Sequence, residues 1–234
     1  MNDAENIMNK CLVWNLGLTD YKTAYDMQLR LADSRYQKKT GDIILTLEHP
    51  PTITLGKFGN PDNILAGEEE LSRLGIEVCA SNRGGDVSFH CPGQLVIYPI
   101  LDMRLRGGEL RRFMHDLEQA VIDTAQHFGI RGERWPEHPG VWVEGKQLAA
   151  IGLHFMRGIS MHGISFNINP SLDGFKTINL CGLPGKEATS ISALAKREVN
   201  ADEARPVFLN IFSQVLGVEF EVVENPHAQG GILG

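Results

Sequence analysis

The sequence predicts an α+β fold. Three segments have the 3.6-residue periodicity of amphipathic helices, and short β-rich runs lie between them. The helices are separated by groups of strands and do not alternate regularly with single strands, which favours α+β over α/β. The chain has 234 residues, of which 42% are hydrophobic and 22% charged, so it can bury a core and has an ordinary globular composition.

Capping residues and apolar stripes predict where the three helices lie. The first follows Asp20 and ends before Thr40. The second ends at Phe128-Gly129, where glycine can close a helix. The third begins at Asn200, with Glu203 three residues later as in a capping box. The apolar stripes run through residues 24–31, 110–125 and 204–215, and we interpret all three as core faces.

Strands are expected in six runs, at residues 43–47, 95–98, 141–143, 148–152, 163–169 and 219–223. Alternation along residues 162–169 places His162, Ile164, Phe166 and Ile168 on one face. We interpret residues 1–234 as one catalytic domain. Within it, residues 199–223 form a small helix-plus-strand element, and the glycine-containing tail 224–234 is expected to be flexible.

Charge and hydropathy exclude several classes of function. A net charge of −7 argues against nucleic-acid binding, which needs a concentrated basic surface. A group of arginines is either a solvated helix flank or a weak sign of an acidic partner, and its members are Arg104, Arg106, Arg111, Arg112, Arg131 and Arg134. No apolar run is long enough for a membrane span, and residues 1–6 do not resemble a secretory signal. We expect a cytoplasmic protein.

The four cysteines, at positions 11, 79, 91 and 181, have neither disulfide-framework nor zinc-site spacing, so reduced thiols are expected. A metal site built from His90, Cys91, His162 and Cys181 is disfavoured because adjacent strand residues point to opposite faces. We therefore expect no metal and no other cofactor.

Four segments carry residues suited to chemistry. The first is the stretch Arg83 to Gln94, in which paired glycines let backbone N–H groups approach a ligand; a plain glycine-rich turn is the alternative. The second and third are residues 147–152 and 162–169, which also suit ordinary buried strands. The fourth is Cys181-Gly182. A thiol there is either a small buried hydrophobe or a nucleophile, and a nucleophile needs a positive neighbour or aligned N–H groups.

Taken in this order, the four segments resemble the lipoyl(octanoyl) transferase family, and residues 47–56 resemble that family's entry to the site. The resemblance spans about residues 10–220. It implies the fold of biotin and lipoate ligases, in which a mixed sheet flanked by helices holds an acyl chain in a tunnel. The residues that would line the acyl site are Arg83, Gly84, Gly85, Asp86, Val87, Ser88, Phe89, His90, Ala150, Ile151, Gly152, Gly163, Ile164 and Ser165.

The resemblance also implies a two-step acyl transfer, the first step of endogenous protein lipoylation. Cys181 would attack the octanoyl or lipoyl thioester of acyl carrier protein and form an acyl-thioester intermediate. A specific lysine of an apo lipoyl domain, or of the glycine cleavage H protein, would then take the acyl group. No ATP is needed, because a thioester is already activated.

Three positions depart from the family's pattern. Cys91 stands where the family has glycine after His90, and Leu180 stands where it has proline before the nucleophile. The third is Gln147, at the position of the family's lysine, which lowers the pKa of the nucleophile and shuttles protons. Lys146 lies one position earlier.

A two-residue turn at Glu144-Gly145 would pair Val143 with Lys146 and Trp142 with Gln147, so that Lys146 points away from the nucleophile. Two versions of the catalytic site follow. In one, Gln147 faces the thiol and the enzyme is slower near neutral pH. In the other, a bulge turns Lys146 inward and restores the charge.

Two other functions compete with this interpretation. An ATP-dependent lipoate ligase shares the fold but would show a lysine near a Gly-Ser-Ala sequence, where this chain has Ile151-Gly152-Leu153. A non-catalytic acyl-binding relative would keep the pocket after losing the lysine, as Gln147 allows.

Overall fold

The computed structural model of the protein describes residues 10–136 and 138–223. In this part of the chain, one sheet has eight strands in the order β11-β1-β2-β6-β10-β9-β8-β7, and a second has the order β4-β3-β5. The strands of the large sheet are β1 (Cys11–Leu18), β2 (Asp42–Glu48), β6 (Gln94–Ile100), β7 (Glu133–Trp135), β8 (His138–Val143), β9 (Lys146–Met156), β10 (Ile159–Asn167) and β11 (Phe220–Val223). Those of the small sheet are β3 (Thr52–Leu55), β4 (Glu77–Ala80) and β5 (Val87–His90).

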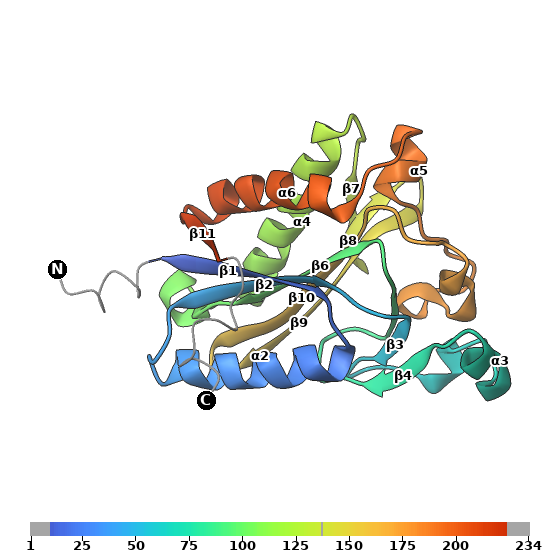
Figure 1. The fold of residues 1–234 in the computed structure, drawn as a ribbon, viewed down its shortest axis with the longest axis horizontal. Helices are drawn as coiled ribbons and strands as arrows, with labels where there is room; N and C mark the ends of the chain where they lie inside the picture. Colours follow the sequence, from blue (N-terminus) through green and yellow to red (C-terminus); the bar gives the residue numbers. More distant parts are fainter. Residues whose placement is uncertain (1–9, 137, 224–234) are drawn as a thin grey trace.

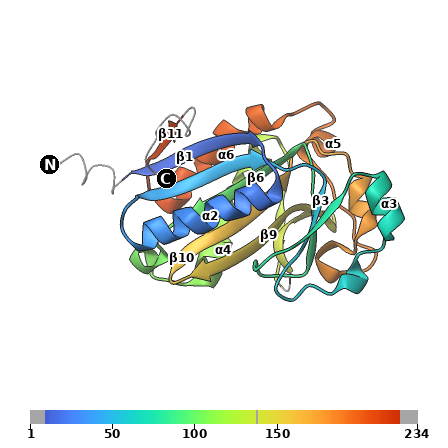
Figure 2. The ribbon, with the colours of Figure 1, turned by 60° about the horizontal axis from the view of Figure 1, so that its bottom comes forward.

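Helices cover both faces of the large sheet, with α2 on one face and α4 and α6 on the other (Figure 1). Figure 2 shows α2 lying along the strands. The helices are α2 (Tyr21–Tyr36), α3 (Glu68–Arg73), α4 (Leu110–His127), α5 (Ile191–Ala195) and α6 (Ala201–Leu216). Short 3-10 turns are η1 (Pro61–Asn63), η2 (Met103–Arg106), η3 (Gly174–Thr177) and η4 (Leu180–Gly182). None of the helices in the described ranges is long and apolar enough to cross a membrane.

Strand directions confirm the expected mixed sheet. β1 is parallel to β2 and to β11, and the neighbours from β2 through β6, β10, β9 and β8 to β7 are antiparallel. The predicted C-terminal helix and strand are α6 and β11. Helix α6 packs on α4, and β11 extends the sheet edge at β1. The tail 224–234 and residues 1–6 lie outside the described residues.

Helices α2 and α6 begin at the caps that the sequence predicts. The Asp20 carboxylate accepts from the N–H of Thr23 at 2.8 Å, and the Asn200 side-chain oxygen accepts from the N–H of Glu203 at 2.9 Å. Only this half of the expected capping box forms, because the Glu203 carboxylate pairs with Arg197 at 2.7 Å. Both caps satisfy N–H groups that have no partner within the helix.

Three apolar clusters hold the layers together. The first lies between the sheet and helices α4 and α6 and includes Phe113, Phe166 and Phe208. The second lies under α2 and includes Trp14 and Leu45. The third fills the space between the small sheet and turns η3 and η4, and includes Ile53, Phe89, Phe175 and Leu180. The third cluster therefore ties η4, which carries Cys181, to strand β5.

The expected alternation along β10 is wrong at one residue. Ile164 and Phe166 belong to the cluster under α4, whereas the His162 ring stacks on Tyr25 of α2 with centroids 5.5 Å apart. His162 has a φ of 56°, a left-handed conformation that breaks the two-residue period of a strand.

Several of the clustered arginines serve the structure. Arg104 pairs with Asp102 at 2.6 Å, Arg106 with Asp42 at 2.9 Å, and Arg134 with Glu118 at 3.1 Å. These three guanidinium groups are bound to the protein's own carboxylates, so they do not support the idea of a basic surface for an acidic partner.

Candidate active site

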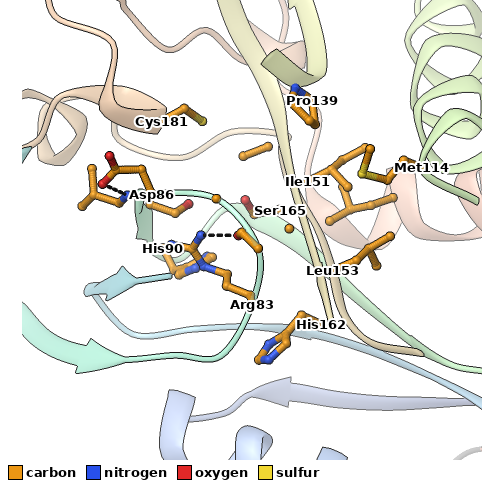
Figure 3. Close-up of a pocket in the computed structure, with 18 of the residues that line it drawn as sticks. Arg83, Asp86, His90, Met114, Pro139, Ile151, Leu153, His162, Ser165 and Cys181 are labelled. Carbon is orange, nitrogen blue, oxygen red and sulfur yellow. Dashed lines mark hydrogen bonds between the residues drawn. The ribbon is translucent and has the colours of Figure 1, made fainter. Parts of the chain in front are cut away.

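A cavity of about 310 Å³ lies where the glycine-rich loop before β5 crosses strands β9 and β10 (Figure 3). Every residue that the sequence assigned to acyl binding lines it, apart from Phe89. Those residues are Arg83, Gly84, Gly85, Asp86, Val87, Ser88, His90, Ala150, Ile151, Gly152, Gly163, Ile164 and Ser165. The Cys181 thiol lies on the same cavity, so the fold brings all four sequence segments together.

Phe89 is a correction to the sequence-based assignment. Its ring packs edge-on against Phe175 at 5.2 Å, in the cluster behind β5, while Ser88 and His90 line the cavity. Successive strand residues point to opposite faces, so a continuous run from 83 to 90 could not all face one ligand. Cys91 also lies in the cluster behind β5, on the side away from the cavity that His90 lines.

The cavity has a polar and an apolar side. Figure 3 shows Arg83, Asp86, His90 and Cys181 on one side, and Met114, Ile151 and Leu153 on the other. The sequence did not assign eight further lining residues to the acyl site, which are Tyr21, Tyr98, Leu110, Met114, His138, Pro139, Leu153 and His162. Leu110 and Met114 were interpreted as core stripe, and apolar spacing alone cannot separate a core residue from a cavity wall.

Glycines allow the loop to lie directly on the strands. Gly84 donates its N–H to the carbonyl of Leu153 at 2.9 Å. A Cβ on Gly152 would lie 2.9 Å from the Gly84 carbonyl oxygen, and a Cβ on Gly56 would collide with the carbonyl of Gly85. The close backbone approach, rather than a turn alone, therefore requires these residues to lack a side chain.

Cys181 occupies a strained backbone position in η4. Its φ of 53° and ψ of 28° lie in the left-handed region, and Gly182 follows with a φ of 73°. A Cβ on Gly182 would meet the carboxylate of Asp86. Left-handed non-glycine residues cluster at functional sites, because the surrounding structure must hold them there. The backbone geometry therefore supports a functional role for Cys181.

Gln147, and not Lys146, faces the thiol. The pairs Trp142 with Gln147 and Val143 with Lys146 form as predicted, around the turn at Glu144-Gly145. The Gln147 side-chain amide donates a hydrogen bond to the sulfur of Cys181 at 3.1 Å. The N–H of Gln147 donates to the carbonyl of Glu187, and its carbonyl accepts from Thr189, so the backbone here is fixed on both sides.

The version of the site in which a bulge turns Lys146 inward is wrong. The Lys146 ammonium lies 2.6 Å from the carboxylate of Glu187, and both side chains are more than half exposed. The strand does contain a register shift, between the pairs Val141 with Ala149 and Trp142 with Gln147. This shift leaves Gln147 on the inner face and Lys146 on the outer one.

The surroundings of Cys181 hold the thiol mainly in its protonated form. Burial raises the pKa of Cys181 above its ordinary value, while the Gln147 hydrogen bond and then the positive charge of Arg83 lower it in part. The Asp86 carboxylate raises the pKa further. Asp86 is itself fixed by hydrogen bonds from the backbone N–H groups of Asn60 and Val87 and from the side-chain amide of Asn63.

Two buried imidazoles, those of His90 and His162, line the cavity, and a third, that of His49, bonds to the lining residue Tyr98. Burial lowers the pKa of His49 to about 4 and that of His162 to about 3, and it holds the pKa of His90 well below its ordinary value. The His49 Nδ1–H donates to the carbonyl of Thr19 at 2.6 Å, so Nε2 accepts from the Tyr98 hydroxyl at 2.8 Å. In residues 10–136 and 138–223, no group of His, Cys, Asp or Glu side chains is arranged to hold a metal ion.

Comparisons with known proteins show the family and the fold class to which this chain belongs. The sequence matches the family of lipoyl protein ligase A/B catalytic domains over residues 20–213. The solved structure of lipoate-protein ligase A bound with ATP has a TM-score of 0.71 and 14% identity, covering 94% of this chain and 91% of that one. Biotin protein ligase from Aquifex aeolicus has a TM-score of 0.51 and 14% identity, covering 90% of this chain and 70% of that one. At this identity the structures show the fold alone, and it is the expected one.

A relative with higher sequence identity identifies the group of enzymes within this family. A curated octanoyltransferase from Solibacter usitatus is 43% identical over 212 residues, which are 91% of this chain and 96% of that protein. The chain therefore belongs to the octanoyltransferases within the lipoyl protein ligase A/B catalytic domain family. The resemblance inferred from the four motifs is confirmed.

Proposed function

We propose that this protein is an acyltransferase that moves an octanoyl or lipoyl group from acyl carrier protein to a lysine of a lipoyl domain or of the glycine cleavage H protein. One observation carries the proposal. A cysteine in a strained backbone position borders a cavity whose far side is apolar, in a chain 43% identical to a curated octanoyltransferase. The reaction needs a free thiol, and we place it in the cytoplasm, where thiols stay reduced.

The first step is acylation of the thiol. The sulfur of Cys181 bonds to the carbonyl carbon of the donor thioester, and the carbon–sulfur bond to the donor breaks. The donor leaves as a thiol, having taken up the proton that Cys181 loses. The product is an acyl-thioester intermediate, with the acyl chain along Ile151 and Met114 on the apolar side of the cavity.

The second step restores the thiol. The acceptor's lysine nitrogen, in its neutral form, bonds to the acyl carbon, and the bond from that carbon to the sulfur of Cys181 breaks. The nitrogen gives up one proton, Cys181 regains one, and an amide is left on the acceptor. Gln147 can donate a hydrogen bond to the sulfur in both steps but cannot carry the proton.

A transfer assay separates this proposal from an ATP-dependent ligase. The purified protein is incubated with octanoyl carrier protein and an apo lipoyl domain in the absence of ATP, and the mass of the acceptor is followed. We expect one octanoyl group on the acceptor with the wild type and none with Cys181→Ser. Modification that requires ATP and free octanoate would instead identify a ligase.

A non-catalytic acyl-binding relative is the second candidate, and the neutral Gln147 beside the thiol favours it. Such a protein would take up the octanoyl chain without passing it on. Full occupancy by octanoyl ligand, measured by titration, together with no modified acceptor between pH 7 and pH 9, would identify it.

A further inference from the structure

The guanidinium of Arg83 is a buried positive charge, and no carboxylate of the described residues pairs with it. Its residue is 8% exposed. Its Nε donates to the hydroxyl of Thr54 at 3.1 Å, and its Nη2 donates to the carbonyl and hydroxyl of Thr54 at 2.7 and 2.8 Å. Nη1 donates to the carbonyl of Gly84 at 3.1 Å. All of these acceptors are neutral, so the charge itself has no counter-ion in the described structure.

A buried charge outside an ion pair is costly, and a charge of this kind in a cleft marks a candidate functional site. Burial lowers the pKa of Arg83, but a guanidinium stays charged in proteins. Asp86, on the same cavity, accepts hydrogen bonds from the neutral N–H groups of Asn60, Asn63 and Val87, and its charge acts on Arg83 without forming an ion pair. Arg83 therefore forms no ion pair with a described carboxylate, and its charge can act on an anion that forms in the cavity.

The fold holds the guanidinium at this position. A Cβ on Gly56 would lie 2.9 Å from Nη1 of Arg83, and one on Gly152 would lie 3.2 Å from its Cδ. The Arg83 side chain lies against Gly56 and Gly152 and donates three bonds to Thr54, so it is held at the cavity wall. Cys181 lines the same cavity. A charge fixed before the reaction needs no reorganisation when an anion forms.

Cys181 is the group on this cavity that becomes anionic during the proposed reaction. Lys146 points to solvent and Gln147 is neutral, so neither brings a positive charge to the thiol. We propose that Arg83 is the cation that stabilises the Cys181 thiolate and the oxyanion of each tetrahedral intermediate, the electrostatic role of a lysine at position 147. The oxyanion part of this inference rests on the proposed function, whereas the thiolate part does not. In agreement, the charge of Arg83 lowers the pKa of Cys181.

The test is the pH dependence of Cys181 alkylation by iodoacetamide in the full-length protein, followed by peptide mass spectrometry. The proteins compared are the wild type, Arg83→Gln, Gln147→Lys and the double variant. Loss of a nearby opposite charge changes a pKa by about one unit or more, so Arg83→Gln should slow alkylation about tenfold below the pKa. A lysine at 147 in the double variant should return the profile to that of the wild type.

Two results would overturn the inference. One is an unchanged alkylation profile in Arg83→Gln. The other is a slowed profile that Gln147→Lys does not restore, which would mean that Arg83 only holds the loop. Arg73→Gln is the matched control, because Arg73 is 72% exposed in its side chain, lies on α3 and should leave the profile unchanged.

If circular dichroism shows that Arg83→Gln does not fold, Arg83→Lys replaces it. Lysine keeps the charge but loses the fork of bonds to Thr54. A profile close to that of the wild type supports the inference, and a tenfold slowing would contradict it. Alkylation uses no acyl donor, so failure of octanoyl transfer alongside an Arg83-dependent profile would refute the proposed function and leave the thiolate role of Arg83 standing.

Discussion

The side-chain amide of Gln147 donates a hydrogen bond to the sulfur of Cys181 across 3.1 Å, at the position where the motif resemblance predicts a lysine. A neutral donor stabilises a thiolate, but it adds no charge and cannot accept a proton. The nucleophile therefore depends on more distant charge and on the pH of the solution.

The first prediction concerns the pH dependence of transfer. Burial raises the pKa of Cys181, and the thiolate is the attacking form, so the reactive fraction grows as pH rises toward that pKa. The initial rate of acylation should increase by about tenfold for each pH unit below the pKa. Rates between pH 6 and pH 9 at a fixed donor concentration test this. A flat profile would show that the thiolate is already formed at neutral pH.

The second prediction concerns the charge at position 147. Gln147→Lys places an ammonium beside the sulfur and should lower the pKa of Cys181 by about one unit, equivalent to about 1.4 kcal/mol and a tenfold gain at neutral pH. Initial rates at pH 7 measure the gain.

Lys146→Ala is the control for this variant, because Lys146 pairs with Glu187 at the surface and should be dispensable. Loss of transfer in Lys146→Ala would contradict the observed orientation of the two side chains.

The third prediction concerns chain length. Met114 lies on the side of the cavity opposite Cys181, so it should limit how long an acyl chain can be (Figure 3). Met114→Ala should raise the ratio of kcat/KM for decanoyl over octanoyl carrier protein about tenfold, since a pocket discriminates roughly 1–3 kcal/mol per methylene. Met114→Trp should favour hexanoyl.

Leu105→Ala serves as the comparison, because Leu105 is exposed and lies outside the cavity. A Met114→Ala variant with an unchanged chain-length ratio would place the end of the acyl chain elsewhere.

The fourth prediction concerns stability in mild acid. His49 and His162 are buried with pKa values lowered to about 4 and about 3, so the unfolded chain binds protons more readily than the folded one. Their contribution to stability is complete above pH 6.5 and is lost as pH falls toward those values, by on the order of 2 kcal/mol per histidine at pH 5. Urea unfolding at pH 7.5 and pH 5 measures this.

His162→Phe keeps the ring between Tyr25 and Tyr98 and should reduce the difference between the two pH values. A difference equal to that of the wild type would mean that His162 is charged in the folded state.

The features of the fold that the sequence predicts correctly depend on contacts between residues that are close together in the chain. Asp20 and Asn200 mark helix starts because their side chains bond to N–H groups three residues away. The orientation of Gln147 also follows from a local rule, since a two-residue turn fixes strand register. Only the resemblance to the transferase family predicts that the four segments line one cavity.

The missed features depend on distant partners. The six predicted runs do not include strands β1, β3 and β4. Strand β1 pairs with β2 and β11, and β4 pairs with β3, but none of these three strands has a strong periodic pattern. The wrong face for His162 results from one left-handed residue, which no spacing rule detects. Met114 has the same apolar character whether it faces the core or the cavity. In each case, the decisive neighbour lies far away in the sequence.

Intact-protein mass spectrometry after mixing with octanoyl carrier protein shows whether Cys181 carries the acyl group. We expect one octanoyl adduct on the wild type, located at Cys181, absent from Cys181→Ser and removed when an apo lipoyl domain is added. An adduct that persists in Cys181→Ser, or acceptor modification by that variant at the wild-type rate, would contradict it.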